Sequence, residues 1–227
     1  RAIAQGGEGE VRFLVAEAFW ADWHPYLHTA QIQRRIEQQI FDPLVRIETE
    51  DIAALAPALA ESWENVDELT WEFTLRQGVT FHKGQPFTAA DVLFSFAAAY
   101  DPTVKSALAG TLSVGGQPLK VTAPNPHTVV VEYPAVFGPG IRLLDNIPIM
   151  PRHKLEASLK AGTFAQAWAT NTPPAELASI GPFVLKQYQP GERLVYERNP
   201  HYWRKDARGV ALPYLDRLTF EIVPAES

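Results

Sequence analysis

The sequence contains no cysteine, which excludes disulfide bonds and every catalytic or metal site that depends on a thiolate. It has no run of lysine and arginine residues, and its net charge is -6. Both features argue against a nucleic-acid-binding surface, so we expect no nucleic acid among its partners. No apolar stretch approaches the length that a membrane-spanning helix needs.

Motifs of catalysis are missing as well. No serine stands in a G-x-S-x-G elbow, and no phosphate-binding loop or dinucleotide fingerprint is present. The glycine-rich stretch 6–9 lacks a following Lys-Ser/Thr and precedes the first predicted strand. No pair of carboxylates has the apolar setting that would separate two pKa values. We therefore expect a protein that is not an enzyme and has no cofactor.

The sequence does have ample material for a packed core, with 46% hydrophobic and 11% aromatic residues in 227. Alternating and helical apolar patterns predict a mixed α/β (α+β) fold. Strands are predicted over 11–16, 44–47, 71–75, 120–122, 128–132, 183–187, 193–197 and 218–223. Helices are predicted over 31–40, 88–100, 137–146, 151–160 and 164–170. The apolar strand over 11–16 is expected to be covered on both faces.

The stretch Ala56–Tyr100 carries the densest local signals. Pro57 is expected to open a short helical turn, because its fixed φ suits the first helical position. Residues 71–75 alternate apolar and polar side chains, which is typical of a half-buried strand. Thr88 and Asp91 have the spacing of a capping box at the start of a helix.

The order of residues in this stretch resembles the signature of the family 5 extracellular solute-binding proteins, the peptide/nickel/opine class that delivers ligands to ABC importers. That signature runs P-x-LA-x-SW and then W-x-F-x-LR-x-GV-x-FH-x-G-x-PF-x-A-x-DV. The matching residues are Pro57, Leu59, Ala60, Ser62, Trp63, Trp71, Phe73, Leu75, Arg76, Gly78, Val79, Phe81, His82, Gly84, Pro86, Phe87, Ala89, Asp91 and Val92. A second series, similar to the family's GPF…PGE…RNP-x-YW…LPYLD, begins at Gly181 and ends at Asp216.

The resemblance implies one lobe of a class II periplasmic binding protein-like fold, truncated before the second lobe, because family members are much longer. It implies that residues 1–47 begin the ligand-binding lobe, that 48–170 form an inserted subdomain with the signature, and that 171–227 return to the lobe and end at the hinge crossover. The expected location is periplasmic or extracellular, with the export signal removed and with a lipid anchor as a further option. The expected partners are a peptide or similar small solute and an ABC permease in the membrane.

Candidate ligand-binding residues follow the first strand, because ligands of open α/β sheets gather beyond the carboxyl ends of strands. Aromatic walls suit peptide or sugar ligands, although some of these rings could instead fill the core. The candidates are Phe19, Trp20, Trp23 and His24, with Tyr26 in the same aromatic set. The resemblance adds Gly181 and Pro182, for which the competing interpretation is a tight turn that needs the unusual φ of glycine.

Two alternatives stay open. His24 and His28 have the four-residue spacing that places two imidazoles on one helix face, which suits a metal- or haem-binding protein; the competing interpretation is a pair of surface histidines. The other alternative is a stand-alone interaction module. We also expect the strand 218–223 to have an unpaired edge at the hinge, and therefore a weak homodimer.

Overall fold

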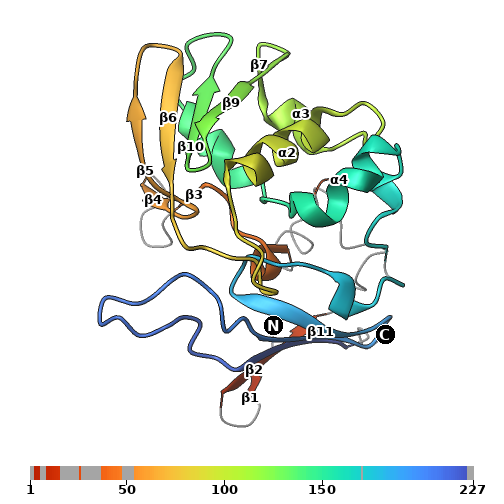
Figure 1. The fold of residues 1–227 in the computed structure, drawn as a ribbon. Helices are drawn as coiled ribbons and strands as arrows, with labels where there is room; N and C mark the ends of the chain where they lie inside the picture. Colours follow the sequence, from red (N-terminus) through yellow and green to blue (C-terminus); the bar gives the residue numbers. More distant parts are fainter. Residues whose placement is uncertain are drawn as a thin grey trace.

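The computed structural model describes residues 3–5, 9–15, 26, 37–47, 54–169 and 171–223. Two β-sheets lie one above the other in Figure 1, and the helices pack beside the upper sheet and between the two. The strands are β1 (Ile3–Gln5), β2 (Glu10–Val15), β3 (Val45–Ile47), β4 (Leu55–Pro57), β5 (Ala60–Asn65), β6 (Thr70–Leu75), β7 (Ser113–Val114), β8 (Gln117–Pro118), β9 (Lys120–Asn125), β10 (Thr128–Glu132), β11 (Phe183–Gln189), β12 (Arg193–Arg198) and β13 (Arg217–Ile222). The α-helices are α2 (Ala89–Tyr100), α3 (Leu108–Thr111) and α4 (Arg152–Lys160), and the 3₁₀ helices are η1 (Gly140–Asn146), η2 (Phe164–Gln166) and η3 (Pro174–Glu176). Residues 37–40 are helical too.

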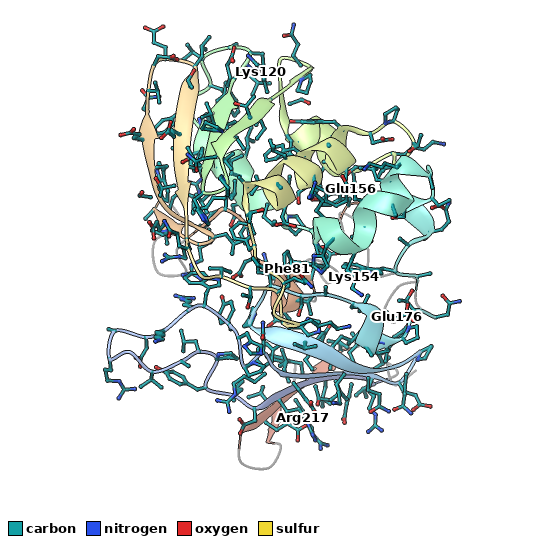
Figure 2. All side chains as sticks on the ribbon, viewed as in Figure 1. Phe81, Lys120, Lys154, Glu156, Glu176 and Arg217 are labelled. Atoms are coloured by element: carbon teal, nitrogen blue, oxygen red, sulfur yellow. The ribbon has the colours of Figure 1, made fainter. Side chains whose placement is uncertain are left out.

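The lower sheet has five strands in the order β1-β2-β13-β12-β11, so segments from the two ends of the chain share it. Only β2 and β13 run parallel, with Glu10 opposite Arg217 and Phe13 opposite Phe220. One face of this sheet is apolar and packs into the core. The other face carries charged side chains on neighbouring strands. Figure 2 shows Arg217 at this outer side of the sheet. The sheet is therefore amphipathic, with one face in the core and the other face in solvent.

Two expectations about this sheet are wrong. β2 is not covered on both faces, because Glu10 and Arg12 lie on the solvated face and Phe13 is 37% exposed. β13 has no unpaired edge, because it pairs with β12 on one side and with β2 on the other. The argument for a homodimer, which depended on that edge, thus loses its basis.

The upper sheet has four strands in the order β5-β6-β10-β9. The predicted strand 71–75 and the hairpin over 120–132 are confirmed as β6 and as β9 with β10. The helical turn expected at Pro57 is wrong: Pro57 ends β4, and Ala60 already begins β5. The reason is non-local, because the amides of Leu59 and Ala60 donate to the carbonyls of Pro43 and Leu44.

The capping box at Thr88 and Asp91 is confirmed, and the carboxylate has a second role. Asp91 Oδ2 accepts from the amide of Thr88 at 3.0 Å, at the start of α2, and Asp91 Oδ1 accepts from the amide of Arg152 at 3.0 Å, at the start of α4. Ser95 extends this link, since its hydroxyl donates to Asp91 O and accepts from Met150 N. One buried carboxylate thus caps two helices that pack against each other.

Replacing Asp91 by alanine is expected to lower the free energy of unfolding by about 2 kcal/mol, because two helix N-termini each lose a cap worth about 1 kcal/mol. Urea denaturation followed by circular dichroism measures this loss. Asp101→Ala is the matched control, because the Asp101 carboxylate accepts from the amide and hydroxyl of Thr103 in an exposed turn and does not link two helices. Equal effects of the two changes would contradict the double cap.

Candidate functional site

One candidate site in the described part of the chain is a hollow, partly open to solvent, between the segment that follows residue 37 and the α3–η1 region. We call it the Glu37 pocket. It is lined by Glu37, Gln38, Phe41, Pro43, Leu108, Asp145, Asn146 and Pro148. Apolar side chains and carboxylate or amide side chains line it in equal number, and this set suits a ligand with apolar, amide and cationic parts.

Three separate segments position these residues. Glu37 comes from the helical residues 37–40, Leu108 from α3, and Asp145 from η1. Hydrogen bonds join the segments: the amide of Ile47 donates to Asp145 Oδ1 at 3.3 Å, and the amide of Ile149 donates to the carbonyl of Asp42 at 3.1 Å. The pocket is therefore built by tertiary contacts rather than by one motif.

Tyr26 lies behind this pocket. Its hydroxyl donates to the carbonyl of Pro148 at 2.9 Å, and its own carbonyl accepts from Ala107 N and from the Ser106 hydroxyl. The side chain is fully buried, and burial raises the pKa of its hydroxyl. Tyr26 is thus a core residue, as one of the two interpretations of the aromatic set expected.

The other members of that set are not among the described residues. Phe19, Trp20, Trp23 and His24, and with them His28 of the metal alternative, lie outside the described residues. Their roles stay predictions. Within the part of the chain that the structure describes, no group of three or more histidine, aspartate or glutamate side chains is placed to hold a metal ion.

Gly181 lies where the chain enters β11 and packs against the end of the helical segment 37–40. Its amide donates to the carbonyl of Ile40 at 3.0 Å, and its carbonyl accepts from Asn199 Nδ2 at 2.9 Å. A Cβ at this position would lie 2.7 Å from the carbonyl carbon of Ile40 and 2.8 Å from the nitrogen of Phe41. The interpretation as an unusual φ is wrong, because the φ of Gly181 is not positive; close backbone approach requires the glycine.

Hydrogen bonds fix the neighbours of Gly181 as well. The carbonyl of Pro182 accepts from the amide of Asn199 at 2.9 Å. The amide of Ser179 donates to His82 Nδ1 at 2.9 Å, and burial lowers the pKa of His82 and favours its neutral form. Residue His82 of the signature stretch is thereby joined to the segment that leads into β11. A contact of Gly181 or Pro182 with ligand stays a prediction.

A buried carboxylate lies beside the Glu37 pocket. Asp42 accepts from Trp203 Nε1 at 2.8 Å, and its other oxygen lies 3.5 Å from the Tyr202 hydroxyl. Burial raises the pKa of Asp42 to about 6. The guanidinium of Arg76 lies over the Trp203 ring at 4.3 Å, and its Nε donates to the carbonyl of Ala58. Sequence reasoning missed this cluster and the Glu37 pocket, because neither has a local pattern.

Comparison with known proteins identifies the family. The profile of the bacterial extracellular solute-binding proteins, family 5, middle part, matches residues 54–227. The chain belongs to this family. Its members are solute-binding proteins and not enzymes, which confirms the expectation drawn from the missing catalytic motifs.

Individual relatives agree. The chain is 31% identical over 175 residues to a probable ABC transporter-binding protein of Deinococcus radiodurans, which covers 74% of this chain and 30% of that protein. It is 28% identical over 187 residues to the periplasmic oligopeptide-binding protein OppA of Salmonella typhimurium, with 75% and 32% covered. The chain spans about a third of the length of these relatives.

Solved structures show the same fold. The ABC transporter substrate-binding protein CtaP of Listeria monocytogenes matches with a TM-score of 0.76 and 25% identity, over 96% of this chain and 41% of that one. The oligopeptide-binding protein AppA of Bacillus subtilis, solved with a nonapeptide, matches with a TM-score of 0.76 and 23% identity, over 95% and 40%. The expected fold class, a mixed α/β lobe of a periplasmic binding protein, is confirmed. In the described part of the chain, no helix has the length and apolar character needed to cross a membrane.

Proposed function

We propose that this chain forms part of the substrate-binding component of an ABC importer and captures a peptide or similar small solute outside the cytoplasmic membrane. Family membership over residues 54–227 is the observation that carries the proposal. Support also comes from relatives described as periplasmic oligopeptide-binding proteins. Delivery to a membrane permease, a periplasmic or extracellular location and a lipid anchor belong to the same proposal.

The proposed mechanism is capture by closure. The lower sheet comes from residues 3–15 and 183–222, whereas the upper sheet comes from 60–132, which supports the division at residues 47 and 170. A second lobe would close on the solute by hinge motion and present a new surface to the permease. In this arrangement the 227 residues provide one wall of the cleft, and the aromatic candidates Phe19, Trp20 and Trp23 would add to that wall.

We propose that the Glu37 pocket contributes to this wall. Phe41 and Leu108 supply apolar surface for a side chain of the solute, and the exposed Gln38 supplies an amide that matches a peptide backbone. Asn146 Nδ2 already donates to the carbonyls of Arg142 and Leu143. The carboxylates of Glu37 and Asp145 favour a cationic group over an anionic one. This chemistry suits a peptide better than it suits a free anion.

Replacing the exposed Gln38 by tryptophan is expected to weaken peptide binding at least about tenfold, because the indole would occupy the mouth of the pocket. Isothermal titration calorimetry of the full-length protein with a set of tri- to pentapeptides measures the change.

Gln117→Trp is the control for this experiment. Gln117 is also exposed, but it lies in β8 and does not line the pocket. Peptide binding that is unaffected by Gln38→Trp would remove the pocket from the proposal. A failure of the wild-type protein to bind any peptide would overturn the peptide assignment itself.

A further inference from the structure

A second hollow, largely open to solvent, lies where the long β12–β13 connection folds back onto the start of β11. Figure 1 shows this connection, in blue, extending to the left of the lower sheet and below the upper one. We call the hollow the Arg204 hollow. It is lined by Pro182, Phe183, Tyr202, Arg204, Leu212, Pro213, Tyr214 and Leu215. None of these residues lines the Glu37 pocket.

Among the described residues that line the hollow, Arg204 is the one with a charged side chain. Within the described residues its guanidinium makes no direct ion pair with an aspartate or glutamate, unlike Arg198 with Asp216 or Arg208 with Asp206. Its charge still favours the ionised form of the buried Asp42. A half-buried guanidinium at an apolar wall is a strong donor for an anion, because its planar fork can make two hydrogen bonds to one carboxylate.

The two hydroxyl groups of the hollow are already engaged. Tyr202 Oη lies 3.5 Å from Asp42 Oδ1, and Tyr214 Oη donates to Asp206 Oδ2 at 2.6 Å. Their rings therefore offer apolar surface rather than donors, and Tyr214 is 57% exposed. A doubly charged phosphate needs several donors, whereas a single guanidinium beside apolar side chains matches a carboxylate on an apolar body.

Hydrogen bonds within the β12–β13 connection hold the wall of the hollow in place. The carboxylate of Asp206 accepts from the amides of Arg208 and Val210, each at 2.8 Å, as well as from Tyr214. Lys205 and Ala211 pair as an isolated bridge. A wall held this way loses little conformational freedom when a ligand binds.

We propose that the Arg204 hollow is a second ligand site, which binds a small apolar carboxylate through Arg204 and through the rings and aliphatic side chains around it. The site is separate from the proposed solute pocket and does not depend on the proposed function. The occupant resembles a leucine or phenylalanine residue with a free carboxyl group and a blocked amine.

The test uses N-acetyl-L-leucine as the probe and N-acetyl-L-leucinamide as its uncharged match, titrated into the full chain and followed by nuclear magnetic resonance. The acid is expected to bind with a dissociation constant of about 1 mM, and the amide at least about tenfold more weakly. The Trp203 indole N–H reports the event, because Trp203 packs beside Tyr202 and donates to Asp42.

Arg204→Gln is expected to weaken binding of the acid about tenfold. Lys160→Gln, which removes an exposed cation of α4 that does not line the hollow, is expected to leave binding unchanged. Gln38→Trp separates this site from the Glu37 pocket and is expected to have no effect on the acid. Equal binding of acid and amide, full binding by Arg204→Gln, or loss of binding by Gln38→Trp would each overturn the proposal.

Discussion

Gly181→Ala is expected to lower the free energy of unfolding by about 3 kcal/mol, at the upper end of the range for overpacked sites. The added methyl group would lie 2.7 Å from the carbonyl carbon of Ile40 and 3.0 Å from the carbonyl oxygen of Gln39. These are backbone atoms, so no side chain can rotate away to make room. To relieve this overlap, residue 181 would have to move away from the helical segment 37–40, which would break its hydrogen bond to Ile40.

Chemical denaturation of the variant and the wild type measures this difference. Gly138→Ala is the matched control, because Gly138 has a φ that is not positive and a Cβ there meets nothing within 4 Å. The control is expected to change the free energy of unfolding by no more than about 0.5 kcal/mol. A loss at Gly181 as small as that at Gly138 would show that the two segments can move apart freely.

The features that could be predicted from the sequence depend on neighbouring residues. Thr88 and Asp91 lie three apart and cap the same helix. Trp71, Phe73 and Leu75 alternate within one strand, and Pro190 and Gly191 connect β11 to β12. In each case the physical cause is contained within a few positions of the chain, so a local pattern is sufficient to indicate it.

The predictions that were wrong, and the features that were missed, depend on residues far apart in the chain. Pro57 was expected in a helix because its φ permits one, but pairing with β3 decides its conformation. The position of β13 in the middle of its sheet follows from β2, which lies about two hundred residues earlier in the chain. The second bond of Asp91, to the amide of Arg152, likewise has no local signal.

The same distinction applies to the candidate site. The residues of the Glu37 pocket come from the segments 37–43, 108 and 145–148, and no motif joins them in the sequence. The first family signature, from Pro57 to Val92, lies elsewhere, in β4, β5, β6, α2 and the turns between them, where its residues cap, pack and pair. The most recognisable part of the chain is therefore scaffold, and the residues of the Glu37 pocket have to be found from the structure.

Asp42 connects the two hollows. Phe41 and Pro43, on either side of it in the chain, line the Glu37 pocket, and its partner Tyr202 lines the Arg204 hollow. The positive charges of Arg46 and Arg204 favour its ionised form, but burial outweighs them and raises its pKa from 3.8 to about 6. The folded protein therefore binds this proton more tightly than the unfolded chain, and the resulting stability is fully present below a pH of about 4 and lost as the pH rises through about 6.

Substitution of Asp42 tests the direction of this pH dependence. Asparagine at position 42 resembles the protonated acid and keeps an acceptor for Trp203 Nε1, so Asp42→Asn should remove this part of the pH dependence. Between a pH of about 4 and about 8, the free energy of unfolding of Asp42→Asn is expected to rise relative to the wild type by about 3 kcal/mol. Urea denaturation across this range measures the difference at each pH.

Asp67→Asn is the control of opposite sign, because the amide of Leu69 donates to this exposed carboxylate and lowers its pKa, so that wild-type stability is lost as the pH falls. A wild-type and Asp42→Asn difference that stays constant with pH would mean that Asp42 ionises as it does in the unfolded chain, with water rather than the protein around it.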